Sequence, residues 1–116
     1  MGSVFGFGVV PRLTDVGAVL LAVGGLLDER VDDPAAAERN AARNRTIRDG
    51  AARFGDRQVL MTNMTRDEHF PISGALEVFA LLSGPKRMGV WEGTHEQLTA
   101  EAMTMAIDFF RLHLAP

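Results

Sequence analysis

The chain contains no cysteine and a single lysine, Lys86, so its other strong cations are arginines. Without cysteine the protein can form no disulfide, no thiolate metal site and no cysteine nucleophile. The formal net charge is -3 over 116 residues, and a chain with this charge has little nonspecific attraction for nucleic acid. We therefore expect no nucleic-acid partner.

Targeting segments and common cofactor motifs are also missing. Residues 1–10 have no basic region of the kind that opens a secretory signal. The apolar stretch from Val16 to Leu27 is short for a membrane span and rich in glycine. The sequence has no P-loop, no dinucleotide-binding fingerprint and no zinc-ligand spacing. We expect a cytoplasmic protein with no membrane partner and no metal.

What the sequence does contain is an alternation of helical and strand patterns. Hydrophobic residues make up 47% and charged residues 23% of the chain, which is typical of a globular domain or part of one. Alternating helices and strands predict an α/β fold with a parallel sheet. We expect strands over residues 16–23, 59–62 and 86–91, and helices over residues 2–10, 34 to about 48 or 54, 76–82, and 94 or 99 to 113.

The first expected strand raises a problem of its own. The run from Val16 to Val23 is continuously apolar, which suits a parallel strand buried on both faces. If the chain begins at Met1, no earlier strand lies beside it, and an apolar strand at a sheet edge promotes association. We expect this edge to pair with a second copy of the chain or with a missing N-terminal half.

An acid and a histidine follow the second and third expected strands. Asp67 comes after the apolar run 58–62, and His95 comes after the run 87–91. Open α/β sheets bind their ligands at the carboxyl ends of their strands. The separation of 28 residues (95 − 67) leaves room for one helix and one strand. We therefore predict that the two side chains lie within hydrogen-bond reach of each other.

Residues 58–114 resemble the C-terminal end of α/β-hydrolases, particularly dienelactone-hydrolase-like and related esterase members. In those families the acid stands four residues before a proline, as in Asp67-Glu68-His69-Phe70-Pro71. The histidine follows a Gly-x-His turn ahead of the terminal helix, as in Gly93-Thr94-His95. The resemblance implies a partial α/β-hydrolase fold of about three parallel strands alternating with helices. It also implies that Asp67 and His95 are the acid and histidine of a Ser-Asp-His triad.

The activity implied for the intact enzyme is hydrolysis of a carboxylic ester, a lactone or a related acyl substrate, with no cofactor. The N-terminus resembles the segment that follows the nucleophile serine in many members, where Met-Gly precedes a small apolar helix. Met1 is then the residue after the serine, and its N–H is a candidate oxyanion donor. The resemblance implies that residues 1–116 are a single C-terminal part of the domain, and the upstream reading frame is expected to encode Gly-x-Ser.

Simpler interpretations stand beside this one. Asp67 could be a turn acid near Pro71, and His95 could cap the last helix. Glu68 competes with Asp67 as the acid. As a whole, the chain could be a noncatalytic truncated fragment or an interaction module that assembles through its exposed sheet edge.

Other reactive side chains lack the spacing that chemistry requires. Ser3, Ser73 and Ser83 have no nucleophile elbow around them. His69 lies beside two acids, but neighbours on one loop supply no fixed metal geometry. His113 falls in the last turn of the terminal helix, where a cation favours the helix dipole. We assign none of them to the site.

Overall fold

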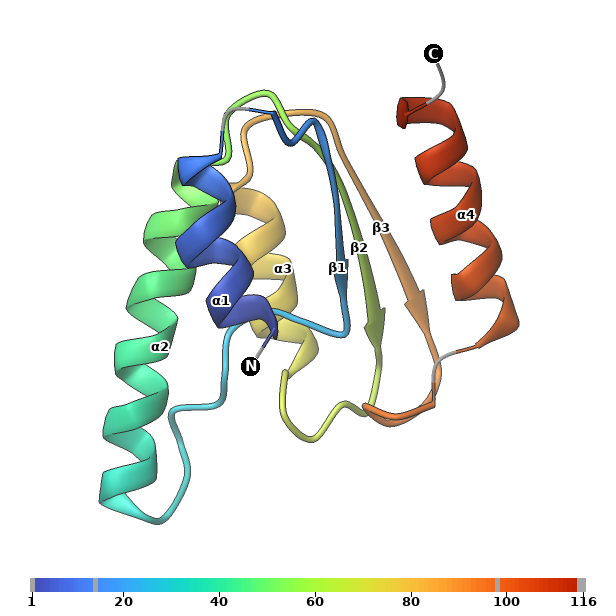
Figure 1. Ribbon diagram of the computed structural model, residues 1–116. Coiled ribbons are helices and arrows are strands. Elements are labelled where there is room, and N and C mark those ends of the chain that lie inside the picture. Colours follow the sequence, from blue (N-terminus) through green and yellow to red (C-terminus); the bar gives the residue numbers. More distant parts are fainter. Residues whose placement is uncertain (1, 14, 98, 115–116) are drawn as a thin grey trace.

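The computed structural model describes residues 2–13, 15–97 and 99–114. Three parallel strands form one sheet in the order β1-β2-β3. Helices α1, α2 and α3 cover one face of this sheet, and α4 covers the other (Figure 1). The predicted α/β fold with three parallel strands is therefore confirmed. The elements are α1 Gly2–Val9, a short 3-10 helix Val10–Arg12, β1 Ala18–Ala22, α2 Pro34–Ala52, β2 Gln58–Met64, α3 Ile72–Leu81, β3 Lys86–Trp91 and α4 Ala100–Leu114.

The central strand β2 supplies the core on both sides of the sheet. Successive side chains of a strand point to opposite faces, and all but the first residue of β2 are buried. Met61 pairs in register with Leu21 on β1 and with Met88 on β3. Met61 and Leu21 belong to the cluster packed between the sheet and helices α1 to α3, which also contains Phe7, Ile47, Phe54 and Val78, and Met88 packs against it.

Helix α2 begins as its sequence predicts and ends between the two expected limits, residues 48 and 54. Asp33 caps it by accepting the Ala35 N–H at 3.1 Å, and Pro34 occupies the first turn. The helix continues through Gly50 to Ala52, so Gly50 does not end it. At Gly50 an added Cβ would lie 1.9 Å from the carbonyl oxygen of Phe7. The missing side chain lets α1 approach α2 closely.

We expect Gly50→Ala to destabilise the fold by about 1–3 kcal/mol or more, the usual cost of overpacking a tight interface. The helix propensity that alanine gains over glycine is only about 1 kcal/mol, and the clashing atom belongs to the backbone of Phe7, which cannot swing aside. Chemical unfolding followed by circular dichroism measures the loss. Gly17→Ala is the matched control, because a Cβ there meets nothing within 4 Å. Equal stability of the two variants would contradict this packing.

Two helices bury less apolar surface than the sequence suggests. Helix α3 begins at Ile72, four residues before the expected start, and it buries Ala75 and Val78 while Leu76 is 52% exposed. Helix α4 buries Ala102 and Phe109, but Leu112 is 69% exposed. The nearly all-apolar run 76–82 predicts a well-buried helix, and the exposure of Leu76 and Leu81 shows that this prediction was wrong. The spacing of the apolar residues of the last helix predicts one apolar stripe that includes Leu98, which lies outside the described residues.

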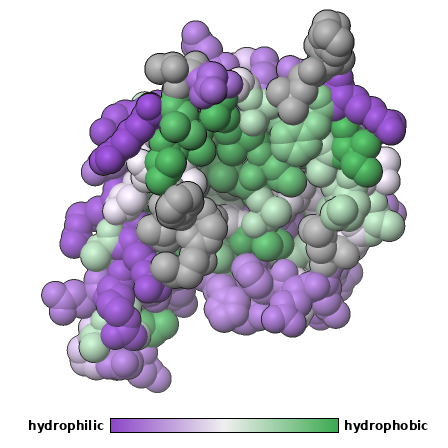
Figure 2. Space-filling model, viewed as in Figure 1, coloured by the Kyte–Doolittle hydropathy of each residue, from purple (hydrophilic) through white to green (hydrophobic). Residues whose placement is uncertain are grey.

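Both outer strands have a free edge. Within the part of the chain that the structure describes, no strand pairs with the far side of β1 or of β3. Figure 2 shows apolar side chains gathered where β1 lies nearest the viewer, extending toward α1 and α4. None of the described helices combines the length and the apolar character needed to cross a membrane.

Candidate functional site

The loops after β2 and β3 run side by side at the carboxyl edge of the sheet. The N–H of Thr65 donates to the Trp91 carbonyl at 2.9 Å, and the N–H of Arg66 donates to the Gly93 carbonyl at 2.8 Å. Gly93 has a φ of 149°, and a Cβ there would lie 2.8 Å from Met64 Cε. Glycine at this position lets the second loop turn while it stays against the first.

This arrangement brings Asp67 and His95 together. Asp67 Oδ2 lies 2.8 Å from His95 Nδ1, and the two residues follow adjacent parallel strands. The predicted contact between these side chains is therefore present. The Asp67 side chain is fully buried, whereas the His95 side chain is 26% exposed. The buried acid thus holds a histidine that remains open to solvent.

The contact also determines which ring nitrogen carries the hydrogen. The carboxylate of Asp67 has no hydrogen to donate, so it accepts one from Nδ1. Its other oxygen, Oδ1, accepts the main-chain N–H groups of His69 and Phe70, each at 2.8 Å. With the hydrogen on Nδ1, the lone pair of His95 is on Nε2. A histidine in this tautomer can take a proton from a neighbouring hydroxyl.

Three neighbours of Asp67 also contact His95. The ring of Phe70 stacks on the imidazole with centroids 5.7 Å apart, and the ring of His69 meets it edge-on at 4.9 Å. Glu68 Oε2 accepts the main-chain N–H of His95 at 3.3 Å. Glu68 therefore contacts the backbone of His95, and Asp67 contacts the ring. Glu68 was the competing acid in the sequence analysis, whereas the contact of Phe70 with His95 was not predicted.

The structure does not show a candidate nucleophile or the candidate oxyanion donor beside Asp67 and His95. Met1 and the side chain of Ser3 lie outside what the structure describes. Ser83 precedes β3 and so lies at the amino edge of the sheet, opposite the Asp67–His95 pair. Ser73 is an exposed residue in the first turn of α3. Among the described residues, no group of three or more His, Asp or Glu side chains is placed to hold a metal ion.

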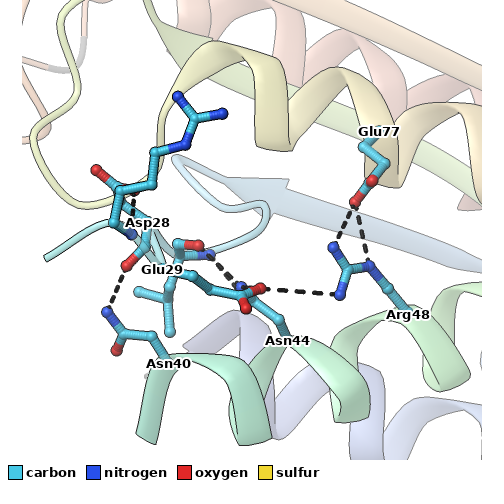
Figure 3. A network of polar contacts seen from close by, with 8 residues as sticks. Asp28, Glu29, Asn40, Asn44, Arg48 and Glu77 are labelled. Carbon is cyan, nitrogen blue, oxygen red and sulfur yellow. Dashed lines mark hydrogen bonds and ion pairs between the residues drawn. The ribbon is translucent and has the colours of Figure 1, made fainter. Parts of the chain in front are cut away.

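A separate polar network fixes the loop between β1 and α2 (Figure 3). Asn44 is buried, its Oδ1 accepts the N–H of Leu27, and its Nδ2 donates to the Leu27 carbonyl, both at 2.8 Å. Arg48 pairs with Glu77 at 3.1 Å and with Glu29 at 3.8 Å. Arg48 lies on α2 with its side chain 42% exposed, and its two ion pairs tie the loop and α3 to α2.

This network borders a cavity of about 380 Å³ between the loop and helices α2 and α3. Its lining includes Pro71 and Ser73 but neither Asp67 nor His95. The cavity is therefore beside the pair and does not contain it.

The end of β1 is also held in an unusual conformation. Val23 has a φ of 45°, a left-handed conformation that β-branched residues rarely adopt. The N–H of Val23 donates to the Thr62 carbonyl, and Asn63 Nδ2 donates to the Gly24 carbonyl at 2.7 Å. Asn63 is buried on the central strand. The pair Gly24-Gly25 predicts the end of the strand from the sequence, but nothing in the sequence indicates this anchor.

No protein-family model matches the sequence, and a search of curated proteins finds no significant match. Solved structures do match its fold. A cold-adapted esterase from an Arctic intertidal metagenomic library aligns with 98% of this chain at a TM-score of 0.77 and 19% identity, over 46% of the esterase chain. The acetyl xylan esterase from Paenibacillus sp. R4 aligns with 97% at a TM-score of 0.73 and 16% identity, over 42% of its length.

A third match is the esterase domain of a Rhodothermus marinus protein, with a TM-score of 0.69 and 16% identity. It aligns with 98% of this chain and is covered over 59% of its own length. The chain thus spans less than half the length of the Arctic and Paenibacillus esterases. Three parallel strands alternating with helices, in the arrangement of these esterases, give the chain the fold of part of an α/β-hydrolase.

Proposed function

We propose that this chain supplies the acid and the histidine of a serine-type acyl hydrolase. The observation that carries the proposal is the 2.8 Å contact between Asp67 Oδ2 and His95 Nδ1 at the carboxyl ends of adjacent strands. In this role His95 accepts the serine proton through Nε2 and later returns it to the leaving group. Asp67 holds the ring tautomer and stabilises the imidazolium that forms.

The nucleophile in this proposal comes from a segment outside the described residues. A serine directly before Met1 would place the Met1 N–H where an oxyanion donor is needed. The coverage of less than half of the Arctic and Paenibacillus esterases agrees with a complementary N-terminal half. The substrate class is a carboxylic ester, a lactone or a related acyl compound, cleaved through an acyl-enzyme that water then hydrolyses. The direct test is to express the chain with its upstream coding sequence and measure ester hydrolysis.

The second candidate is a noncatalytic module that assembles through its sheet edge. The apolar face around β1 favours this reading (Figure 2), because monomers rarely expose large apolar patches without a partner. The two candidates differ in whether a serine joins the Asp67–His95 pair. A complete coding sequence without a Gly-x-Ser before Met1 would favour the module.

The chain alone is expected to be inactive. Since the described residues place no serine beside His95, the purified protein should hydrolyse p-nitrophenyl acetate no faster than its His95→Ala variant. Stopped-flow measurement of nitrophenol release distinguishes true turnover from slow background reaction with imidazole. A burst of acylation that disappears in Ser3→Ala would instead identify Ser3 as a nucleophile.

A further inference from the structure

One carboxylate organises both the contact to His95 and the turn beside it. While Asp67 Oδ2 contacts the ring, Asp67 Oδ1 accepts the N–H groups of the residues two and three positions further along. Bonds of this kind close a local turn in the backbone. The turn therefore sets where the side chains of His69 and Phe70 stand relative to the imidazole of His95.

Phe70 is the better placed of these two neighbours to hold the ring. Its ring plane makes an angle of 27° with the imidazole, which at 5.7 Å is an offset stack. Phe70 is buried, so its own surroundings fix it. His69 meets the imidazole at 88°, but its side chain is 61% exposed. Packing thus fixes the stacked neighbour and leaves the edge-on neighbour exposed to solvent.

A ring that is bound at one nitrogen keeps some freedom to rotate. The terminal torsion of histidine is broad and roughly two-fold. Asp67 holds the ring of His95 at Nδ1 alone, so this hydrogen bond does not by itself fix the ring plane. A flat aromatic side chain against one face resists rotation, because an imidazole turned out of plane would collide with it. This restraint would keep Nε2 directed to one point in space.

We propose that Phe70 is a positioning residue that keeps His95 in the orientation and tautomer set by Asp67. Its significance for catalysis rests on the proposed function, but the effect on the ring belongs to this chain alone. Without the aromatic ring at position 70, the imidazole samples other orientations, and the tautomer with hydrogen on Nε2 gains population.

The test is magic-angle-spinning NMR of histidine-labelled protein at about pH 8, where an ordinary histidine is neutral. This measurement also works if the chain associates. His95 is assigned by comparison with His95→Gln. The wild-type protein should show a pyrrole-type Nδ1 and a pyridine-type Nε2. Phe70→Leu should shift the ratio of the two tautomers by about two- to tenfold, the range expected for loss of one aromatic contact.

Two controls separate positioning from general damage. Phe70→Tyr keeps a stacking ring and should retain the wild-type ratio. Phe79→Leu removes a phenyl ring from α3 and should also leave the ratio unchanged. Where circular dichroism shows that Phe70→Leu does not fold, Phe70→Met gives the same comparison with an unbranched side chain of similar size.

The outcomes for positioning and for hydrolysis are distinct. A wild-type ratio in Phe70→Leu or Phe70→Met, with a folded protein, overturns the role of Phe70 and leaves the proposed hydrolase standing. A shifted ratio in a protein whose completed form hydrolyses no ester supports the positioning role and removes the proposed function.

Discussion

In an enzyme completed by its serine, His95→Ala is expected to lower kcat for an activated ester by about a million-fold, and Asp67→Asn by about ten-thousand-fold. These are the losses found when the histidine or the acid of a serine triad is removed. The effect of Asp67→Asn follows from the contact with Nδ1: an amide can donate a hydrogen, which favours the tautomer that leaves Nε2 unable to accept the serine proton. KM should change little, because neither group is needed to bind the ground state.

Glu68→Gln is the matched control for this pair. Glu68 is adjacent to Asp67, carries the same kind of charge and contacts the His95 backbone at 3.3 Å. Its side chain is about half exposed, and glutamine keeps an oxygen that can accept the His95 N–H, so the substitution should cost no more than about tenfold in kcat. If Glu68→Gln proved as damaging as Asp67→Asn, the assignment of Asp67 as the triad acid would be wrong.

The contact between Asp67 and His95 could be predicted from the sequence because both residues lie in short local motifs. Asp67 with Pro71, and His95 with Gly93, each follow an apolar strand, and the topology places the ends of parallel strands at one edge. The hydrogen bonds of Asp67 Oδ1 and the stack of Phe70 on His95 depend on side-chain rotamers and on the path of the loop. No spacing in the sequence encodes them.

Burial was harder to predict than the elements themselves. Whether an apolar helical residue is covered depends on which neighbours lie above it, and Leu76 and Leu112 lie on faces that no described residue covers fully. Gly50 illustrates the same limit for helix ends. Glycine often marks the end of a helix. Here Gly50 instead lets the backbone of Phe7, which is distant in sequence, pack closely against α2.

The second large effect concerns assembly through the free edge of β1. We expect that the isolated chain is not a stable monomer: it should pair with a second copy, bind a complementary half or aggregate. The strand Ala18–Ala22 has no charge or proline to discourage pairing, and the apolar face around it is continuous in Figure 2. Sedimentation velocity over a range of concentrations should therefore show species larger than the 12.6 kDa chain.

Leu20→Lys is the sharpest probe of this edge. Leu20 is only partly buried, whereas Leu21 is part of the core cluster, so lysine at position 21 would damage the fold itself. A cation held against an apolar partner should weaken association on the order of a hundredfold or more, since burying an unpaired polar or charged group costs several kcal/mol.

Leu76→Lys distinguishes pairing through this edge from nonspecific association of apolar surface. Leu76 is 52% exposed on α3, which covers one face of the sheet and is not part of the β1 edge (Figure 1). If apolar surface of any kind drives association, both lysine variants should weaken it equally. If strand pairing drives it, only Leu20→Lys should. A well-folded monomer at high concentration, unchanged by either substitution, would show that the edge of β1 needs no partner and would weaken the case for a complementary half.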